Sequence, residues 1–193
     1  MSSRFLVVYE LMGTKPVERL LCLASKLLGM RTLIMLGNTV SPLSVSRLVR
    51  DCKLSIAGIL GDLDNPAVAR AFQSEGLLLE CRVAQLEGLR ILGHGVSCSL
   101  QSLPAAEVDL VVTAKPGIQW GCCKPGSDIV DYICNTYKPL LAITGGCNTP
   151  CQGSKVFSPG SLRLNYVGLI ELDLRNRTWR VTAKRLDEIL NNY

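Results

Sequence analysis

The chain has 193 residues, of which 48% are hydrophobic and 19% charged, and its formal net charge is +5. A chain of this length can bury about 70% of its unfolded surface, which excludes disorder and means that a core needs neither disulfides nor a structural metal. It contains nine cysteines and one histidine, His94, so a metal centre with several histidine ligands is excluded.

The first part of the chain alternates short apolar runs with segments of helical period. The expected strands are Arg4 to Tyr9, Thr32 to Leu36 and Ser55 to Leu60. The expected helices are Lys15 to Leu28, Pro42 to about Cys52 with Ser41 as N-cap, and one that begins at Pro66. This alternation predicts parallel strands joined by right-handed crossover connections.

The remainder is dominated by strand-like segments. A turn at Glu87-Gly88 predicts a hairpin, and helices are expected over Ser127 to Tyr137 and near Ile189. The other expected strands are Leu79 to Ala84, Leu89 to Leu92, Val108 to Thr113, Leu140 to Thr144, Lys155 to Ser158, Leu164 to Leu174 and Thr178 to Ala183. Since no repeat or linker divides the chain, residues 1–193 are expected to form a single α/β domain.

The sequence predicts a cytoplasmic protein without a membrane span. Lys26 and Arg31 interrupt the most hydrophobic stretch, so no run of about 18 apolar residues is free of charge. Met1 to Arg4 precede a very short apolar run, which lacks the length and the small-residue cleavage site of a signal peptide.

The nine cysteines are spread through the chain. Cys22, Cys81 and Cys134 are expected to be buried free thiols, because they lie in apolar strand or helix patterns and free cysteine packs as a small hydrophobic residue. Disulfides are unusual in the cytoplasm unless the source is a hyperthermophile. Four other cysteines lie in glycine- and proline-rich loops, with spacings that suit zinc only if all four meet in space. They are Cys122, Cys123, Cys147 and Cys151.

The ends of the expected strands carry glycine-rich or polar segments, and ligands of open α/β sheets bind at such ends. The segments are Glu10-Leu11-Met12-Gly13, Gly37-Asn38, Gly61-Asp62-Leu63-Asp64, Thr113-Ala114-Lys115-Pro116-Gly117, Gly145-Gly146-Cys147-Asn148 and Ser158-Pro159-Gly160-Ser161. In order and spacing they resemble the motifs of the calcineurin-like metallophosphoesterases, from about residue 4 to residue 173. The resemblance implies a four-layer α/β/β/α sandwich of two mixed sheets.

Enzymes of that family hold two metal ions with aspartate, asparagine and histidine side chains, so that a metal-bound hydroxide attacks phosphorus. Most of the corresponding positions are replaced here. Glu10 and Met12 stand at the first motif, Asn38 at the bridging aspartate, Asp62 and Leu63 at an asparagine and a histidine, and Ala114, Gly146 and Asn148 at three further histidines. Asp64 is kept, and we expect it to form an Asx turn or cap the helix that begins at Pro66. With no histidine at any ligand position, no dinuclear centre and no cofactor are expected.

Several roles stay open for the polar residues of this pocket. Glu10, Asn38, Asp62 and Asn148 are the remaining candidate ligands for one divalent cation (Mg²⁺, Mn²⁺ or Zn²⁺), with a hard cation favoured over zinc. Lys115 is otherwise expected to neutralise Glu10 or Asp62. His94 is expected near the pocket but not as a base, because the sequence offers it no orienting partner. The four loop cysteines are expected at the pocket rim, where a cysteine-based metal or redox site stays open.

Three functions are compatible with this pattern. The leading hypothesis is a degenerate phosphoesterase-fold protein that binds or scaffolds, with a protein partner or a second copy as its target. The alternative is a phosphoesterase with an altered, mononuclear metal site that acts on a phosphomonoester or phosphodiester. Nucleic-acid binding is not favoured, because the six basic residues within 163–185 are accompanied by Glu171 and Asp173 and form no stripe with aromatic residues.

Overall fold

Residues 2–191 are the part of the chain that the computed structural model describes. The strands are β1 (Ser2–Val8), β2 (Thr32–Met35), β3 (Ser55–Gly58), β4 (Leu77–Leu78), β5 (Arg82–Leu86), β6 (Leu89–His94), β7 (Leu110–Thr113), β8 (Leu141–Thr144), β9 (Cys151–Gln152), β10 (Val156–Ser158), β11 (Tyr166–Asp173) and β12 (Thr178–Arg185). The α-helices are α1 (Lys15–Leu28), α2 (Pro42–Arg50), α3 (Pro66–Glu75), α4 (Asp128–Tyr137) and α5 (Leu186–Asn191). Two short 3₁₀ helices cover Leu100–Ser102 and Leu162–Leu164.

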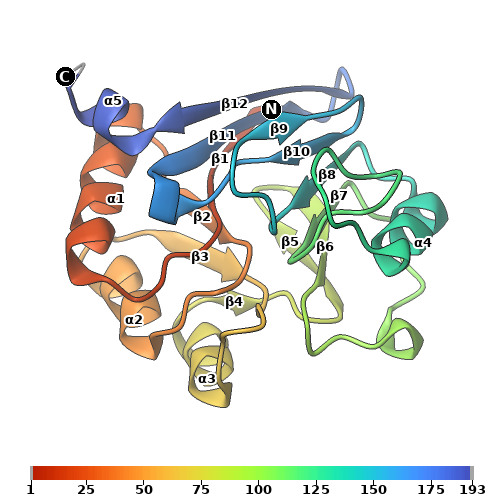
Figure 1. The fold of residues 1–193 in the computed structure, drawn as a ribbon, viewed down its shortest axis with the longest axis horizontal. Coiled ribbons are helices and arrows are strands. Elements are labelled where there is room, and N and C mark those ends of the chain that lie inside the picture. The colour runs from red at the N-terminus through yellow and green to blue at the C-terminus, as the bar shows by residue number, and fades with distance from the viewer. Residues whose placement is uncertain (1, 192–193) are drawn as a thin grey trace.

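These elements form four layers (Figure 1). Two six-stranded sheets pack face to face, in the orders β12-β11-β1-β2-β3-β4 and β5-β6-β7-β8-β10-β9. Helices α1, α2, α3 and α5 cover the outer face of the first sheet, and α4 covers the outer face of the second. The predicted α/β/β/α sandwich of two mixed sheets is therefore confirmed.

The alternating first part of the chain builds the parallel half of the first sheet. Strands β1 to β4 pair in parallel in chain order, with a helix between each consecutive pair. Helices α2 and α3 both begin at a proline, as predicted, since proline has the φ of a first helical turn and lacks only an N–H that would have no partner there. Strands β11 and β12 then extend this sheet antiparallel to β1.

The expected strand over Leu79 to Ala84 was placed wrongly. The chain crosses from one sheet to the other within it: β4 pairs with β3 in the first sheet, whereas β5 pairs with β6 in the second. Cys81 lies at the crossing with a φ of 56°, which breaks the extended backbone. The Glu87-Gly88 hairpin turn is confirmed, with φ values of 52° and 79° that match the right-handed twist of the paired strands.

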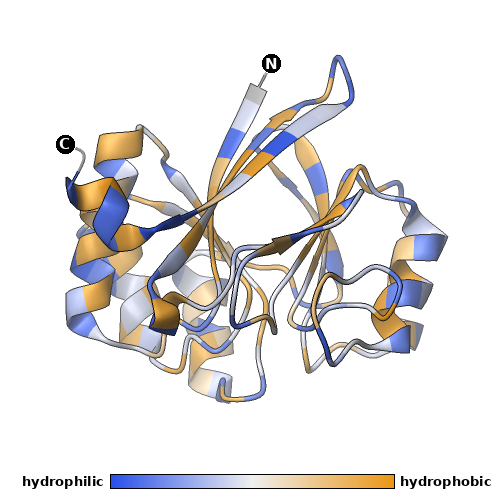
Figure 2. Ribbon diagram, turned by 45° about the horizontal axis from the view of Figure 1, so that its top comes forward, coloured by the Kyte–Doolittle hydropathy of each residue, from blue (hydrophilic) through white to orange (hydrophobic). Residues whose placement is uncertain are grey.

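Three apolar clusters hold the layers together. One lies between the first sheet and its helices, one between the two sheets, and one between the second sheet and α4. Figure 2 shows that the helices carry both hydrophobic and hydrophilic residues, as expected of helices that cover a sheet with one face. Among residues 2–191, no helix combines the length and apolar character needed to cross a bilayer.

The cysteines form four disulfides, which the sequence did not predict. The pairs are Cys22–Cys52, Cys81–Cys98, Cys122–Cys151 and Cys123–Cys147. The expectation of free thiols was wrong for Cys22 and Cys81, because folding brings each within disulfide range of a partner, with Cα atoms 5.3 and 5.1 Å apart. It was right for Cys134, which is buried and free, and burial raises the pKa of its thiol to about 12.

Replacing Cys22 and Cys52 together by serine is expected to lower the free energy of unfolding by about 3 to 4 kcal/mol, because the disulfide joins residues 30 apart in the sequence. Urea unfolding of both proteins, purified without reductant, measures the difference. In dithiothreitol neither protein has the bond, so the difference should disappear. A difference that persists under reduction would show that the disulfide is not its source.

Candidate functional site

Two adjoining cavities open at the carboxyl ends of the strands. The larger has a volume of about 240 Å³ and the smaller about 200 Å³. Three residues line both cavities: Asp62, Ala114 and Lys115. His94 lines the larger cavity, whereas Asn38 and Gly146 line the smaller one. The structure thus joins into one cleft residues from five strand ends that are far apart in the sequence.

The loops after β1 and β2 have an unusual backbone. Glu10, Met12, Asn38 and Val40 have φ values of 63°, 57°, 55° and 67°, in the left-handed region that side chains other than glycine rarely adopt. Such conformations cost of order 1–3 kcal/mol each and persist only where the surroundings enforce them. Glu10, Met12 and Val40 are therefore held in a conformation that their residue types do not favour, whereas asparagine adopts this region more readily.

Asp64 holds part of this backbone in place through hydrogen bonds. Its carboxylate accepts hydrogen bonds from the backbone N–H of Val40 at 2.7 Å and of Gly61 at 2.8 Å, and so ties the loop after β2 to the loop after β3. The expectation that Asp64 caps α3 or forms an Asx turn was wrong, because the N-cap is Asn65, whose side chain accepts from the N–H of Ala67 and Val68. The role of Asp64 is structural, but it acts between loops.

Tyr9 is the residue around which the smaller cavity is organised, and sequence reasoning missed it. The amide nitrogen of Asn38 donates to the Tyr9 hydroxyl at 3.3 Å, and the amide oxygen of Asn38 accepts from the N–H of Leu63 at 3.1 Å. Burial, and then the carboxylates of Glu10 and Asp62, raise the pKa of Tyr9 to about 12, so its phenol stays protonated at neutral pH. The sequence signal that could have identified Tyr9 is a tyrosine at the end of a buried strand.

The four candidate oxygen ligands do not all converge. Glu10 and Asp62 act electrostatically on Tyr9, to which Asn38 is hydrogen-bonded, whereas Asn148 is exposed and lines neither cavity. One carboxylate oxygen of Glu10 accepts a hydrogen bond from the Ser161 hydroxyl at 2.5 Å. Glu10 therefore already has a protein partner inside the fold.

Lys115 was expected to neutralise Glu10 or Asp62, and it forms an ion pair with Asp62. Its ammonium lies 3.3 Å from a carboxylate oxygen of Asp62, and both side chains are more than half exposed. Exposed pairs of this kind contribute between about 0 and 1 kcal/mol to stability. The pair leaves opposite charges accessible at the junction of the two cavities.

His94 is the last residue of β6 and lines the larger cavity, as its expected position near the pocket implies. The Nε2 atom of His94 is buried and has no hydrogen-bond partner among the described residues. Burial lowers the pKa of the imidazole below its usual value, so the ring is neutral at pH 7. Within residues 2–191, no hydrogen bond joins a carboxylate to the ring, as the orientation of a general base would require.

The loop cysteines are paired across the two loops beside the smaller cavity. Cys123 bonds Cys147, and Cys122 bonds Cys151. Pro125 and Gly146, near Cys123 and Cys147 in the chain, line that cavity. Within residues 2–191, the only cluster of three or more histidine, cysteine, aspartate or glutamate ligand atoms comprises Cys122, Cys147 and Cys151.

Solved structures share this architecture over nearly the whole chain. TT1561 of Thermus thermophilus has a TM-score of 0.73 at 16% identity, covering 96% of this chain and 100% of that one. A protein described as a novel archaeal phosphodiesterase has a TM-score of 0.62 at 12% identity, covering 94% and 99%. GAP50, described as the anchor in the inner membrane complex of Plasmodium, has a TM-score of 0.62 at 12% identity, covering 97% and 85%. No protein-family model and no curated protein matches the sequence.

The chain has the metallophosphoesterase fold. At the positions where the resemblance implies metal ligands, the residues do not fit a pair of ions. Met12, Leu63 and Ala114 carry no side-chain oxygen or nitrogen, and Gly146 has no side chain. Both polar atoms of Asn38 are occupied by protein partners, where a bridging carboxylate would have to contact two metals.

One glycine of the metallophosphoesterase-like frame is required by this arrangement. A Cβ atom on Gly61 would lie 2.3 Å from the side-chain oxygen of Asn38, well inside van der Waals contact. The loop after β3 therefore approaches the loop after β2 closely enough for Leu63 and Asn38 to bond. The hydrogen bonds of the Asn38 side chain therefore connect the chain segments that follow β1, β2 and β3.

Because His94 is the only histidine, its ring protons give single resonances in a proton NMR titration. We expect a pKa below the usual value for histidine, since the buried ring disfavours charge. A lowered folded-state pKa means that stability is complete above the unfolded pKa and falls as the pH drops through the folded one. His94→Gln should remove that acid-dependent loss. A pKa above the usual value would contradict the neutral, unpaired ring.

Proposed function

We propose that the protein is a degenerate metallophosphoesterase-fold binding protein, which uses the loops around the former metal site to bind a protein partner or a second copy. The observation that carries the proposal is the distribution of exposed apolar side chains. Ten large hydrophobic residues are exposed among residues 2–191. Six of them lie on these loops, on α4 or on the 3₁₀ helix Leu100–Ser102. They are Leu63, Val96, Leu100, Ile118, Ile129 and Tyr132, and we call them the apolar rim.

Three members of the apolar rim lie at the cleft, and Leu100 and Tyr132 line a neighbouring cavity beside α4. Val96 and Ile129 line the larger cavity, and Leu63 follows Asp62, which lines both. Tyr132 is three residues after Ile129 and so shares its face of α4. The exposed fraction is 66% for Ile118 and 58% for Tyr132, which is high for side chains of this size. Apolar residues gathered around a polar centre are typical of a site that binds another protein.

The residues inside the cleft support binding over hydrolysis. The oxygens that would hold metal are bonded to the protein itself, as in Glu10 with Ser161 and Asn38 with Tyr9 and Leu63. We therefore propose that the cleft works without a dinuclear metal centre or another cofactor. The archaeal phosphodiesterase and the anchor protein GAP50 have equal TM-scores, so the fold favours neither function and the residues must decide.

The proposal includes the cytoplasmic location that the sequence predicts. Disulfides are rare in the cytoplasm of most organisms, but intracellular proteins of hyperthermophiles are rich in them. Four disulfides in this chain therefore favour a hyperthermophilic source if the location is cytoplasmic.

Hydrolysis is tested with p-nitrophenyl phosphate and bis-p-nitrophenyl phosphate in the presence of Mg²⁺, Mn²⁺, Co²⁺ or Zn²⁺. We expect no turnover above that of the metal ion alone. Asp62→Ala is the test variant, and Asp51→Ala, an exposed carboxylate at the end of α2, is its matched control. Turnover that Asp62→Ala abolishes and Asp51→Ala keeps would overturn the binding proposal in favour of a phosphoesterase with an altered, mononuclear metal site.

The binding surface is tested by photo-crosslinking in an extract of the source organism. A photoreactive amino acid placed at Ile118 or Ile129 should crosslink to one and the same protein, because both positions belong to the apolar rim. The same substitution at Leu43, which is 61% exposed on α2, is the control and should give no such product. Equal crosslinking from Leu43 would show that the apolar rim is not the binding site.

A further inference from the structure

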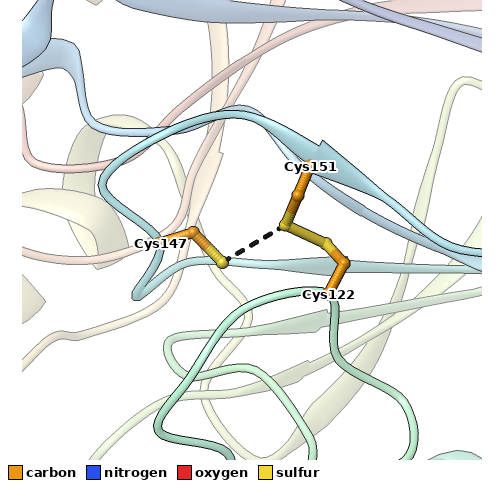
Figure 3. Close-up of side chains that lie close together, drawn as sticks. All are labelled: Cys122, Cys147 and Cys151. Carbon is orange, nitrogen blue, oxygen red and sulfur yellow. Dashed lines mark hydrogen bonds between the residues drawn. A yellow bond between two sulfur atoms is a disulfide. The ribbon is translucent and has the colours of Figure 1, made fainter.

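Two loops at the rim of the cleft carry four cysteines that meet in space. Residues 114–127 follow β7 and contain the neighbours Cys122 and Cys123, and residues 145–151 follow β8 and contain Cys147 and Cys151. Each cysteine of the first loop is bonded to one of the second. Figure 3 shows Cys122 and Cys151 joined, with the sulfur of Cys147 turned toward them.

The two disulfides are in direct contact. The Sγ atoms of Cys147 and Cys151 lie 3.6 Å apart, although these residues belong to different disulfides. The sulfurs of Cys122, Cys147 and Cys151 all lie within 4.8 Å of one another, and the sulfur of Cys123 is bonded to that of Cys147. All four sulfurs therefore form one cluster.

The geometry points to a four-cysteine zinc site that forms when the two disulfides are reduced; we propose that Cys122, Cys123, Cys147 and Cys151 are its ligands. A tetrahedral zinc ion with Zn–S bonds of about 2.3 Å places its sulfurs about 3.8 Å apart. The 3.6 Å contact between Cys147 and Cys151 is close to one edge of that tetrahedron. The two bonded pairs would each separate by less than about 2 Å to complete it, and the sulfur of Cys123, which lies outside the group of three within 4.8 Å, would move closer to the others.

The loops are held in place by contacts that do not depend on the disulfides. Asp131 of α4 is buried, and its carboxylate accepts hydrogen bonds from the N–H groups of Ile118, Gln119 and Trp120 at 2.8 to 3.1 Å. In the second loop, Cys151 belongs to β9 and is paired with Ser158 of β10. The cysteines should therefore stay near one another after reduction, which lowers the entropic cost of binding a metal.

The chemistry of the conversion balances without any group from the cleft. Two molecules of a dithiol reductant each give two electrons and two protons to one disulfide and become cyclic disulfides, which leaves four cysteine thiols. A Zn²⁺ ion then binds the four sulfurs as thiolates and releases four protons, giving a site with a net charge of −2. Reoxidation by a disulfide would reverse the sequence and expel the ion.

The other two disulfides provide an internal control. Within residues 2–191, the only group of three or more possible metal-ligand atoms is the one at the rim of the cleft. Neither Cys22–Cys52 nor Cys81–Cys98 therefore has a third ligand atom close by. Reduction of those pairs should yield free thiols without a tetrathiolate metal site.

Cobalt, whose tetrathiolate complex absorbs in the visible range, is the probe that tests the proposal. The full chain is reduced with dithiothreitol, freed of reductant without oxygen and titrated with Co²⁺, and Zn²⁺ is then added. We expect one equivalent of Co²⁺ with a tetrathiolate spectrum, displaced by one equivalent of Zn²⁺. The oxidised protein should show no such spectrum, and this comparison requires no substitution.

Variants assign the site to the four cysteines. In Cys147→Ser with Cys151→Ser the tetrathiolate spectrum should be lost and Co²⁺ should bind at least 100-fold more weakly, whereas Cys22→Ser with Cys52→Ser should titrate as the wild type does. Circular dichroism shows whether each variant is folded, and Cys151→Ser alone, which leaves three cysteines, is the milder test if the double variant is not. The proposal fails if the reduced wild type gives no tetrathiolate spectrum, or if the Cys147 and Cys151 variant keeps it.

Discussion

The apolar layer between the two sheets is the constraint from which the rest of the structure follows. Seventeen buried side chains fill it, drawn from both sheets. Strand β1 shows how strict it is, because Phe5 and Val7 face this layer while Leu6 and Val8 face the helices. If such a strand shifted by one residue, the side chains that face the other sheet would face the helices, and the reverse. The packing on both faces therefore fixes the register of the strand. The strand ends, and with them the loops, then meet at one edge.

At that edge, polar groups of the strand-end loops hydrogen-bond to one another. Asp64 ties two loops together, Asn38 bonds Tyr9 and Leu63, and Ser161 bonds Glu10. Buried polar groups need partners, and where metal ions would supply them in an enzyme of this fold, side chains and backbone supply them here. Glu10 and Asn38 both have a left-handed backbone, and their side chains hydrogen-bond to Ser161, Tyr9 and Leu63.

The rim of the cleft holds the features on which the two proposals rest. Exposed apolar residues such as Val96 line the cleft beside Asp62 and Lys115, and the loop that carries Ile118 is bound through Cys122 and Cys123 to the loop after β8. A change in the state of these cysteines would therefore act on the same loops that a partner would contact. The binding proposal does not depend on the zinc proposal, because the first rests on exposed side chains and the second on buried or half-buried sulfurs.

The sequence by itself determined what depends on neighbouring residues along the chain. Apolar periodicity and the prolines at 42 and 66 located most helices and strands, and the six strand-end segments indicated the fold. The count of one histidine was enough to exclude a histidine-rich centre, because composition does not depend on folding. The local pattern is informative because the spacing of apolar residues along the chain distinguishes a helix from a strand.

Only the tertiary structure decided what depends on residues far apart. The hydrogen bond between Ser161 and Glu10 joins residues 151 positions apart. The disulfide partners of Cys22 and Cys81 lie 30 and 17 positions away from them. The crossing between sheets at Cys81 and the role of Asp64 were misjudged for a related reason, since the first depends on which strands pair and the second on the contact between two loops. No local pattern encodes such contacts, because packing between layers brings these groups together only once the strands have paired.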